Sequence, residues 1–123
     1  MREEYLDGTE VSGGYCRALK QGNMIFVSGT GGLDQHGKLA GPDVTSQSRL
    51  VYKKIEKALA HFGADLSHIV SVVIYVTDMS TTAEYQAVHS DVFAKYKPTS
   101  TLVGVSGLVA GMSIEIKVEA MID

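Results

Sequence analysis

Residues 97–123, KPTSTLVGVSGLVAGMSIEIKVEAMID, decide the fold, because this stretch contains two strand patterns joined by a glycine-spaced turn. In the second pattern Ile114, Ile116 and Val118 alternate with charged residues, the first of which is Glu115. Alternation of this period places the three apolar side chains on one face of a strand and Glu115 on the other. We therefore expect one face in the core, and Glu115 on the face that meets water or a partner.

The first strand pattern, residues 101–105, follows Pro98, which cannot continue a helix. The chain is therefore predicted to change there from a helical pattern into a strand. We expect any chemistry of the protein to lie beside this strand and the strand of residues 112–122.

The totals indicate a single domain of residues 1–123, a length at which folding buries roughly two-thirds of the surface that the unfolded chain exposes. A lone cysteine, Cys16, excludes an internal disulfide, so a reducing cytoplasm is the expected location. No apolar run approaches the roughly 20 residues of a membrane span, and the N-terminus lacks the pattern of a signal peptide. Because there is no such run, a membrane is not an expected partner. The net charge is −3 and the basic residues are scattered, so a nucleic acid is not an expected partner either.

Toward the N-terminus, residues 15–20 and 24–29 read as two strands of a hairpin, with a turn at Gln21-Gly22-Asn23. Residues 5–14 are predicted to be an irregular lead-in. A glycine-rich loop at residues 29–41 follows the hairpin. A mobile or tightly packed loop is favoured there over a phosphate-binding loop, because no GxxxxGK[ST] motif follows.

Two helices are predicted. The first covers residues 45–62 and is ended by Gly63. The second opens at Thr81 with a capping box and continues toward Pro98; its apolar stripe is Tyr85, Val88, Val92 and Tyr96. Between the helices, residues 69–76 form a continuous β-branched run that is typical of an interior strand.

The order of these elements predicts an α+β domain with one mixed β-sheet and both helices packed on one face. The opposite face carries many apolar residues and has no helix to cover it. It is most simply buried against other copies of the chain, because most soluble oligomers are symmetric homo-oligomers. Sites would then lie between subunits.

The sequence resembles the reactive-intermediate deaminase family, also called RidA or YjgF, over nearly its whole length. The motifs that carry the resemblance are YCRA at 15–18, GNMIFVSG at 22–29, YVTD at 75–78, KP at 97–98, VGV at 103–105 and IEI at 114–116. The resemblance implies a chorismate-mutase-like fold and a homotrimer with three clefts between subunits. It also implies a small-molecule substrate: family members hydrolyse enamines or imines, such as 2-aminoacrylate and 2-iminopropionate, to a 2-keto acid and ammonia without a cofactor.

Residue by residue, the resemblance places Tyr15, Ser28, Gly29 and Glu115 in this cleft. Hydrolysis of an imine requires a group that holds or deprotonates the attacking water, and Glu115 is the candidate for this catalytic role. From the residues alone, a solvated strand residue is the competing interpretation of Glu115. Tyr15 could likewise be a packed residue at the rim.

One departure from the family pattern affects substrate binding. Where the deaminating branch has an arginine that clamps the substrate carboxylate, Pro98-Thr99-Ser100 puts Ser100 in its place. Loss of a guanidinium removes about 1.5 to 3 kcal/mol per charged hydrogen bond, so small imino acids should bind more weakly. Helix-two positions also differ, with Gln86 and His89 where many members carry asparagine and tyrosine. Arg17, on the Tyr15 face of a regular strand, could replace the missing anchor; an exposed arginine or an intersubunit ion pair is the alternative.

Three functions remain open. The first is a deaminase of an enamine or imine, and the second is a non-catalytic metabolite-binding trimer that acts as a sensor, regulator or holdase. A ribonuclease or translation inhibitor ranks last, because the chain is acidic and lacks a basic, aromatic-studded strip. No metal site is expected, since the four histidines come from separate elements: His36, His61, His68 and His89. No GxSxG motif surrounds Ser28, which disfavours a serine hydrolase.

Overall fold

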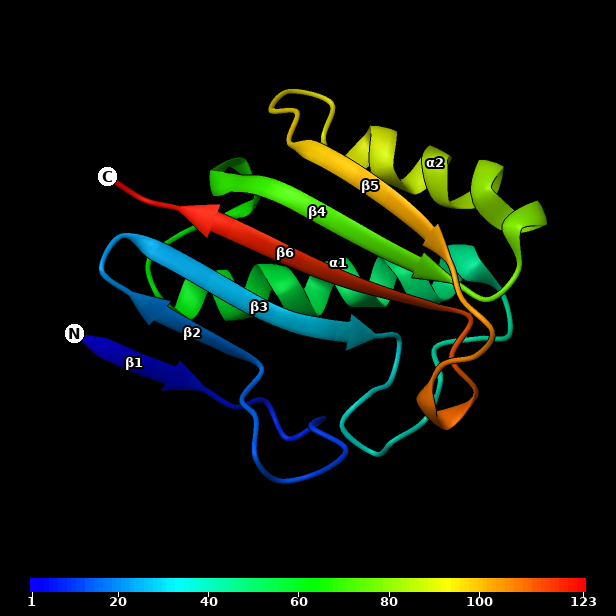
Figure 1. Cartoon of the computed structure of the whole chain (residues 1–123), viewed down its shortest axis with the longest axis horizontal. Helices are drawn as coiled ribbons and strands as arrows, with labels where there is room; N and C mark the ends of the chain where they lie inside the picture. The colour runs from blue at the N-terminus through cyan, green and yellow to red at the C-terminus, as the bar shows by residue number, and fades with distance from the viewer.

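The computed structural model describes residues 1–123, which form one six-stranded sheet and two α-helices (Figure 1). The elements in chain order are β1 (Arg2–Tyr5), β2 (Ala18–Gln21), β3 (Met24–Gly31), α1 (Val44–His61), β4 (Ile69–Val76), α2 (Thr82–Val92), β5 (Thr99–Gly104) and β6 (Ile114–Met121). Short 3₁₀ turns, η1 (Leu66–His68), η2 (Met79–Thr81) and η3 (Val109–Gly111), precede β4, α2 and β6.

The strands lie in the order β1-β2-β3-β6-β4-β5. Only β4 and β5 pair in parallel, so the sheet is mixed as predicted. Strand β4 coincides with the β-branched run and has a neighbour on each side, which confirms its interior position. The two C-terminal strands, β5 and β6, are not neighbours, because β4 lies between them.

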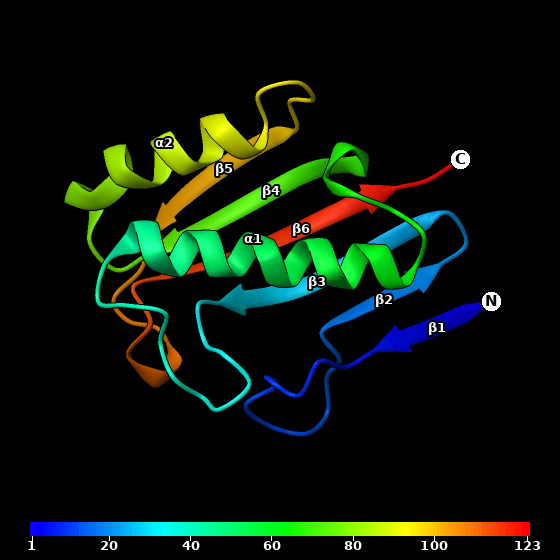
Figure 2. The same ribbon diagram turned by 180° about the vertical axis from the view of Figure 1, so that it is seen from behind.

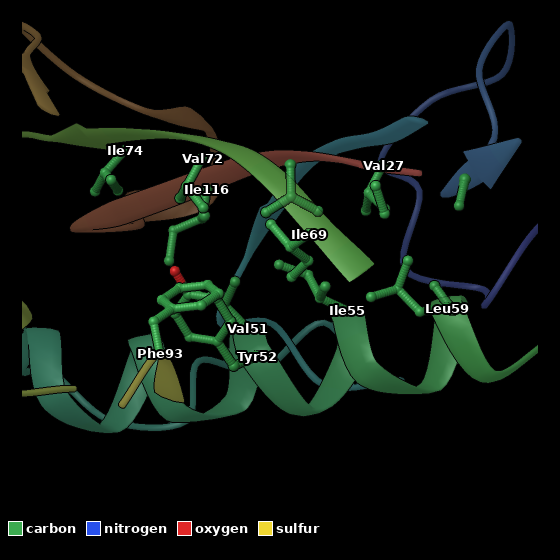
Figure 3. Close-up of a cluster of buried hydrophobic side chains, with 14 of the residues drawn as sticks. Val27, Val51, Tyr52, Ile55, Leu59, Ile69, Val72, Ile74, Phe93 and Ile116 are labelled. Atoms are coloured by element: carbon green, nitrogen blue, oxygen red, sulfur yellow. The ribbon is translucent and has the colours of Figure 1, made fainter. Parts of the chain in front are cut away.

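Both helices cover the same face of the sheet, as the two opposite views show (Figures 1 and 2). The core lies between this face and α1, where Ile55 and Leu59 pack beneath Ile69 and Val27 (Figure 3). Along β6, Ile114, Ile116, Val118 and Ala120 are all buried on this side. The alternation predicted for β6 is therefore confirmed.

Helix α1 begins and ends close to the predicted bounds. Asp43 precedes it as an N-cap, and its carboxylate accepts a hydrogen bond from the Ser46 amide at 2.9 Å. Gly63, with φ of +77°, follows Phe62 in the left-handed conformation that glycine adopts most easily. This confirms the predicted stop signal.

Helix α2 is shorter than predicted. It ends at Val92, and Tyr96 lies beyond it with a side chain that is 51% exposed. The expected capping box is also wrong, since Thr81 makes no side-chain cap; its hydroxyl donates to the Asp78 carbonyl of the preceding turn η2. The prediction placed the end too late because Tyr96 fits the apolar spacing of the helix, whereas the last buried residue of this region is Phe93.

The N-terminal region differs from the prediction in two ways. The edge strand β1 was not predicted, because its sequence REEY has only pairing with β2 to hold it extended. Strand β2 begins at Ala18 and not at Tyr15. Neither helix of the chain combines the length and the apolar character that crossing a membrane would require.

The face of the sheet without helices, called the open face below, alternates charged and apolar side chains. Lys117 of β6 is in register with Val73 of β4, and Glu119 is in register with Phe26 of β3. Several apolar side chains on this face remain partly exposed, among them Phe26 (38%) and Met121 (47%). The open face therefore offers apolar surface that one chain alone does not bury.

Candidate functional site

A β-bulge in β3 brings Gly29 next to Glu115. The pairing of β3 with β6 shifts between Val27 and Thr30, so β3 contains one extra residue there that has no partner on β6. A β-carbon added to Gly29 would lie 2.8 Å from Glu115 Oε1, which shows how closely the carboxylate covers this glycine. Only a residue without a side chain leaves room for the carboxylate in this position.

Glu115 is half-buried on the open face and lines a small pocket, called the Glu115 pocket below. The walls come from the lead-in before β2, the end of β3, α1, η3 and the start of β6. Its lining residues are Thr9, Val11, Tyr15, Arg17, Gly29, Gly31, Leu33, Lys54, Val109, Met112 and Glu115. Three of the four residues assigned to the cleft from the resemblance thus lie together: Tyr15, Gly29 and Glu115.

Tyr15 is held at this pocket by the lead-in. Its hydroxyl accepts a hydrogen bond from the Val11 amide at 2.8 Å. Ser28, the fourth residue assigned to the cleft, lines a neighbouring pocket that also includes Tyr15. The Ser28 hydroxyl donates to the Cys16 carbonyl at 2.8 Å, so it joins β3 to the segment before β2.

Arg17 is buried, with only 3% of its side chain exposed. Its Nη1 donates to the Gly29 carbonyl at 2.8 Å and to Thr30 Oγ1 at 3.1 Å. Its Nε lies 3.6 Å from an Asp7 carboxylate oxygen and 3.8 Å from a Glu10 carboxylate oxygen. The guanidinium therefore fastens the lead-in to the bulge that carries Gly29.

Lys54 of α1 was not predicted as a site residue. Its ammonium donates to the Gly31 and Leu33 carbonyls, both at 2.9 Å, just where β3 ends. Burial lowers the pKa of Lys54, and the nearby charge of Arg17 lowers it further. No sequence signal marks Lys54, because it follows Lys53 on what reads as the charged face of the helix.

The other predicted residues lie elsewhere in the chain. Ser100 on β5 is exposed and in register with Val72, whose side chain faces the helices, so Ser100 and Glu115 point to opposite faces of the sheet. Gln86 on α2 is exposed, and His89 on α2 is half-buried with Nδ1 2.8 Å from the Tyr85 hydroxyl. None of these three lines the Glu115 pocket.

The fold and the pocket define a class: single-domain α+β proteins with two helices on one sheet face and a carboxylate-containing pocket at one end of the sheet. A family profile described as "Endoribonuclease L-PSP" matches residues 7–122. The chain therefore belongs to this family, the RutC/YjgF/RidA family that the motifs predict.

Individual relatives support the assignment to this family. A RutC family protein of Pyrococcus abyssi is 34% identical over 106 residues, 85% of this chain and 84% of that protein. The chloroplastic Reactive Intermediate Deaminase A of Arabidopsis thaliana is 32% identical over 108 residues, 87% of this chain and 56% of that protein. A crystal structure from Mycobacterium tuberculosis, of a YjgF/YER057c/UK114 family member, superposes with a TM-score of 0.89 at 34% identity and covers 99% of this chain and 100% of that one. The predicted fold is thereby confirmed.

Proposed function

We propose that this protein hydrolyses a reactive imine or enamine to a carbonyl compound and ammonia, with Glu115 as the catalytic base. The observation that carries the proposal is the half-buried Glu115 carboxylate over Gly29, in a pocket that also holds Tyr15. The relative named Reactive Intermediate Deaminase A adds support from outside the chain.

The chemistry needs one co-reactant, water. An imine carbon is electrophilic, and a carboxylate beside it can orient a water molecule and accept its proton as the new C–O bond forms. Tyr15 lines the same pocket, and the Gly29 backbone allows the Glu115 carboxylate to lie directly over it. Hydrolysis neither oxidises nor reduces the substrate, so the proposal includes no cofactor and no metal.

We also propose that the site is completed in a homotrimer, whose subunits cover one another's open faces. Exposed apolar side chains on this face, such as Phe26 and Met121, support the assembly. Ser100, Gln86 and His89 could reach a Glu115 pocket only from a neighbouring subunit, because within one chain they lie apart from it. The free thiol of Cys16 fits a reducing cytoplasm, where we place the reaction.

The test is release of ammonia and carbonyl product from freshly generated imines, both with and without a carboxylate, against their spontaneous hydrolysis. We expect acceleration by the wild-type protein and a loss of at least a hundredfold in kcat/KM for Glu115→Gln, which keeps the shape but cannot accept a proton. Glu56→Gln is the matched control, because Glu56 is an exposed residue of α1 outside the pocket. Equal activity of Glu115→Gln and wild type would refute the assigned role.

The second candidate is a non-catalytic metabolite-binding protein. Ser100 favours it, since a serine provides no guanidinium to hold a substrate for turnover. In that case a 2-keto acid should raise the melting temperature of the protein while no imine in the panel is hydrolysed faster than in buffer. Turnover that depends on Glu115 would exclude this candidate.

A further inference from the structure

We propose that the substrate of the Glu115 pocket is an imine that has no carboxylate next to its C=N bond and that binds as the protonated, cationic iminium. The inference rests on the proposed function and narrows its substrate class. It follows from the balance of charges around the pocket.

The charge of the one arginine in the pocket is already offset by two carboxylates of the same chain. Arg17 donates to the Gly29 carbonyl and to the hydroxyls of Thr30 and Thr9, and its Nε faces the Asp7 and Glu10 carboxylates. A substrate carboxylate would have to displace these partners and leave two acidic groups without their counterion. Such a buried charge without a partner is strongly unfavourable.

Glu115 is the one carboxylate of the pocket that has no cationic partner in the chain. Two cations, Arg17 and Lys54, and three carboxylates, Asp7, Glu10 and Glu115, lie in or against the pocket. Asp7 and Glu10 face Arg17, and the charge of Lys54 also acts on these two carboxylates, so two cations offset two carboxylates. Glu115 forms no ion pair within the chain.

A carboxylate on the carbon next to C=N would bring a second negative charge within a few ångströms of Glu115. Like charges at this distance repel strongly where water is partly excluded. An iminium instead supplies the positive charge that Glu115 lacks. Ser100, the position at which the resemblance predicts an anchoring arginine, adds no compensating cation.

The reaction balances with water alone. As the water oxygen bonds to the iminium carbon, its proton passes to Glu115 and the C=N π pair moves to nitrogen, which gives a carbinolamine. Glu115 then returns the proton to nitrogen. The C–N bond breaks as the hydroxyl oxygen forms the carbonyl and loses its proton to the departing ammonia, so iminium plus water gives carbonyl plus ammonium.

Two imines that differ only by the carboxylate test the proposal. An amino-acid oxidase generates 2-imino-3-phenylpropionate from phenylalanine, and a flavin amine oxidase generates the corresponding aldimine from phenethylamine. We expect kcat/KM for the aldimine to exceed that for the imino acid by at least tenfold. The reverse order would overturn the proposal but leave the proposed function standing, whereas no acceleration of either imine would overturn both.

Two variants assign the preference to the named charges. Ser100→Arg should raise activity on the imino acid relative to the aldimine, while Ser90→Arg, an exposed serine of α2, should not. Glu115→Gln should weaken binding of phenethylammonium, measured by calorimetry, by at least tenfold and leave phenylacetate binding equal or tighter. Tighter binding of phenylacetate than of phenethylammonium to the wild-type protein would contradict the proposal without reference to turnover.

Discussion

Gly29 sets the position of the Glu115 carboxylate. A methyl group added there would lie 2.8 Å from Oε1 and 2.9 Å from Cδ of Glu115, closer than real contacts allow. The atoms that must move belong to the end of a flexible side chain, so the fold can adjust but the carboxylate cannot stay in place. The glycine therefore has a geometric reason to be at this position.

We predict that Gly29→Ala lowers kcat/KM about a hundredfold, as a displacement of about 1 Å can do, and changes the free energy of unfolding by less than about 1 kcal/mol. Steady-state kinetics and urea denaturation provide the two values. Gly107→Ala is the control, because no atom lies within 4 Å of its added β-carbon. Full activity of Gly29→Ala would show that the observed carboxylate position is not required.

Arg17 gives a second prediction at this scale. Arg17→Gln removes the charge between Asp7 and Glu10 and should lower the free energy of unfolding by about 3 kcal/mol. Arg49→Gln breaks the exposed ion pair with Asp91, at 2.9 Å, and should cost less than about 1 kcal/mol. Urea denaturation compares the two variants, and similar losses would argue against a structural role for Arg17.

Single residues differ in how well the sequence predicts them. The face of Glu115 follows from alternation along one strand, a local property. The contacts of Arg17 depend on residues seven to thirteen positions away and on a segment, Tyr15 to Arg17, that is not a strand. That Arg17 anchors a substrate anion remains a prediction. Because Arg17 already faces Asp7 and Glu10 of its own chain, we assign the charge that binds the substrate to Glu115.

At the scale of elements, α1 and α2 are joined by a buried chain of hydrogen bonds. The Tyr85 hydroxyl lies 2.6 Å from the Tyr52 hydroxyl and 2.8 Å from His89 Nδ1. Burial raises the pKa values of both tyrosines, so both stay protonated and each has a proton to donate. Neutral His89 accepts from Tyr85, which in turn accepts from Tyr52; a protonated His89 would reverse this direction and leave the Tyr52 proton without an acceptor.

We therefore predict that stability falls with acidification. Burial lowers the pKa of His89 in the folded state, so between its folded and unfolded pKa values the unfolded chain binds more protons. This contribution is fully present above the unfolded value of about 6.5 and is lost as the pH falls below it. The His89→Gln variant should show a smaller loss of unfolding free energy between pH 7 and pH 5 than wild type, and His36→Gln, an exposed loop residue, should behave like wild type.

Elements with strong local signals were predicted well. The β-branched residues of β4 and the glycine after α1 can be recognised from the local sequence alone. Strand β1 carries no such mark, because the charged sequence REEY becomes a strand only through pairing with β2. The end of α2 was placed too late because Tyr96 continues its apolar period although the Tyr96 side chain is 51% exposed.

For the whole molecule, the open face decides the assembly. We predict that the protein sediments as a trimer and that Phe26→Asp, which puts a charge among apolar side chains of this face, shifts it toward monomer. Tyr96→Asp is the control, because Tyr96 is 51% exposed in the loop after α2, away from the open face. Analytical ultracentrifugation measures the mass, and an unchanged trimer in Phe26→Asp would exclude this part of the open face from the interface.

The position of β6 in the sheet also determines when the protein can acquire its structure. Strands β3 and β4 are made by the ribosome before β6, the strand that lies between them and pairs with both. Until β6 has emerged, two half-sheets with unpaired edges are all that the nascent chain can form. Glu115 therefore reaches its position over Gly29 only in the step in which β6 joins the two half-sheets.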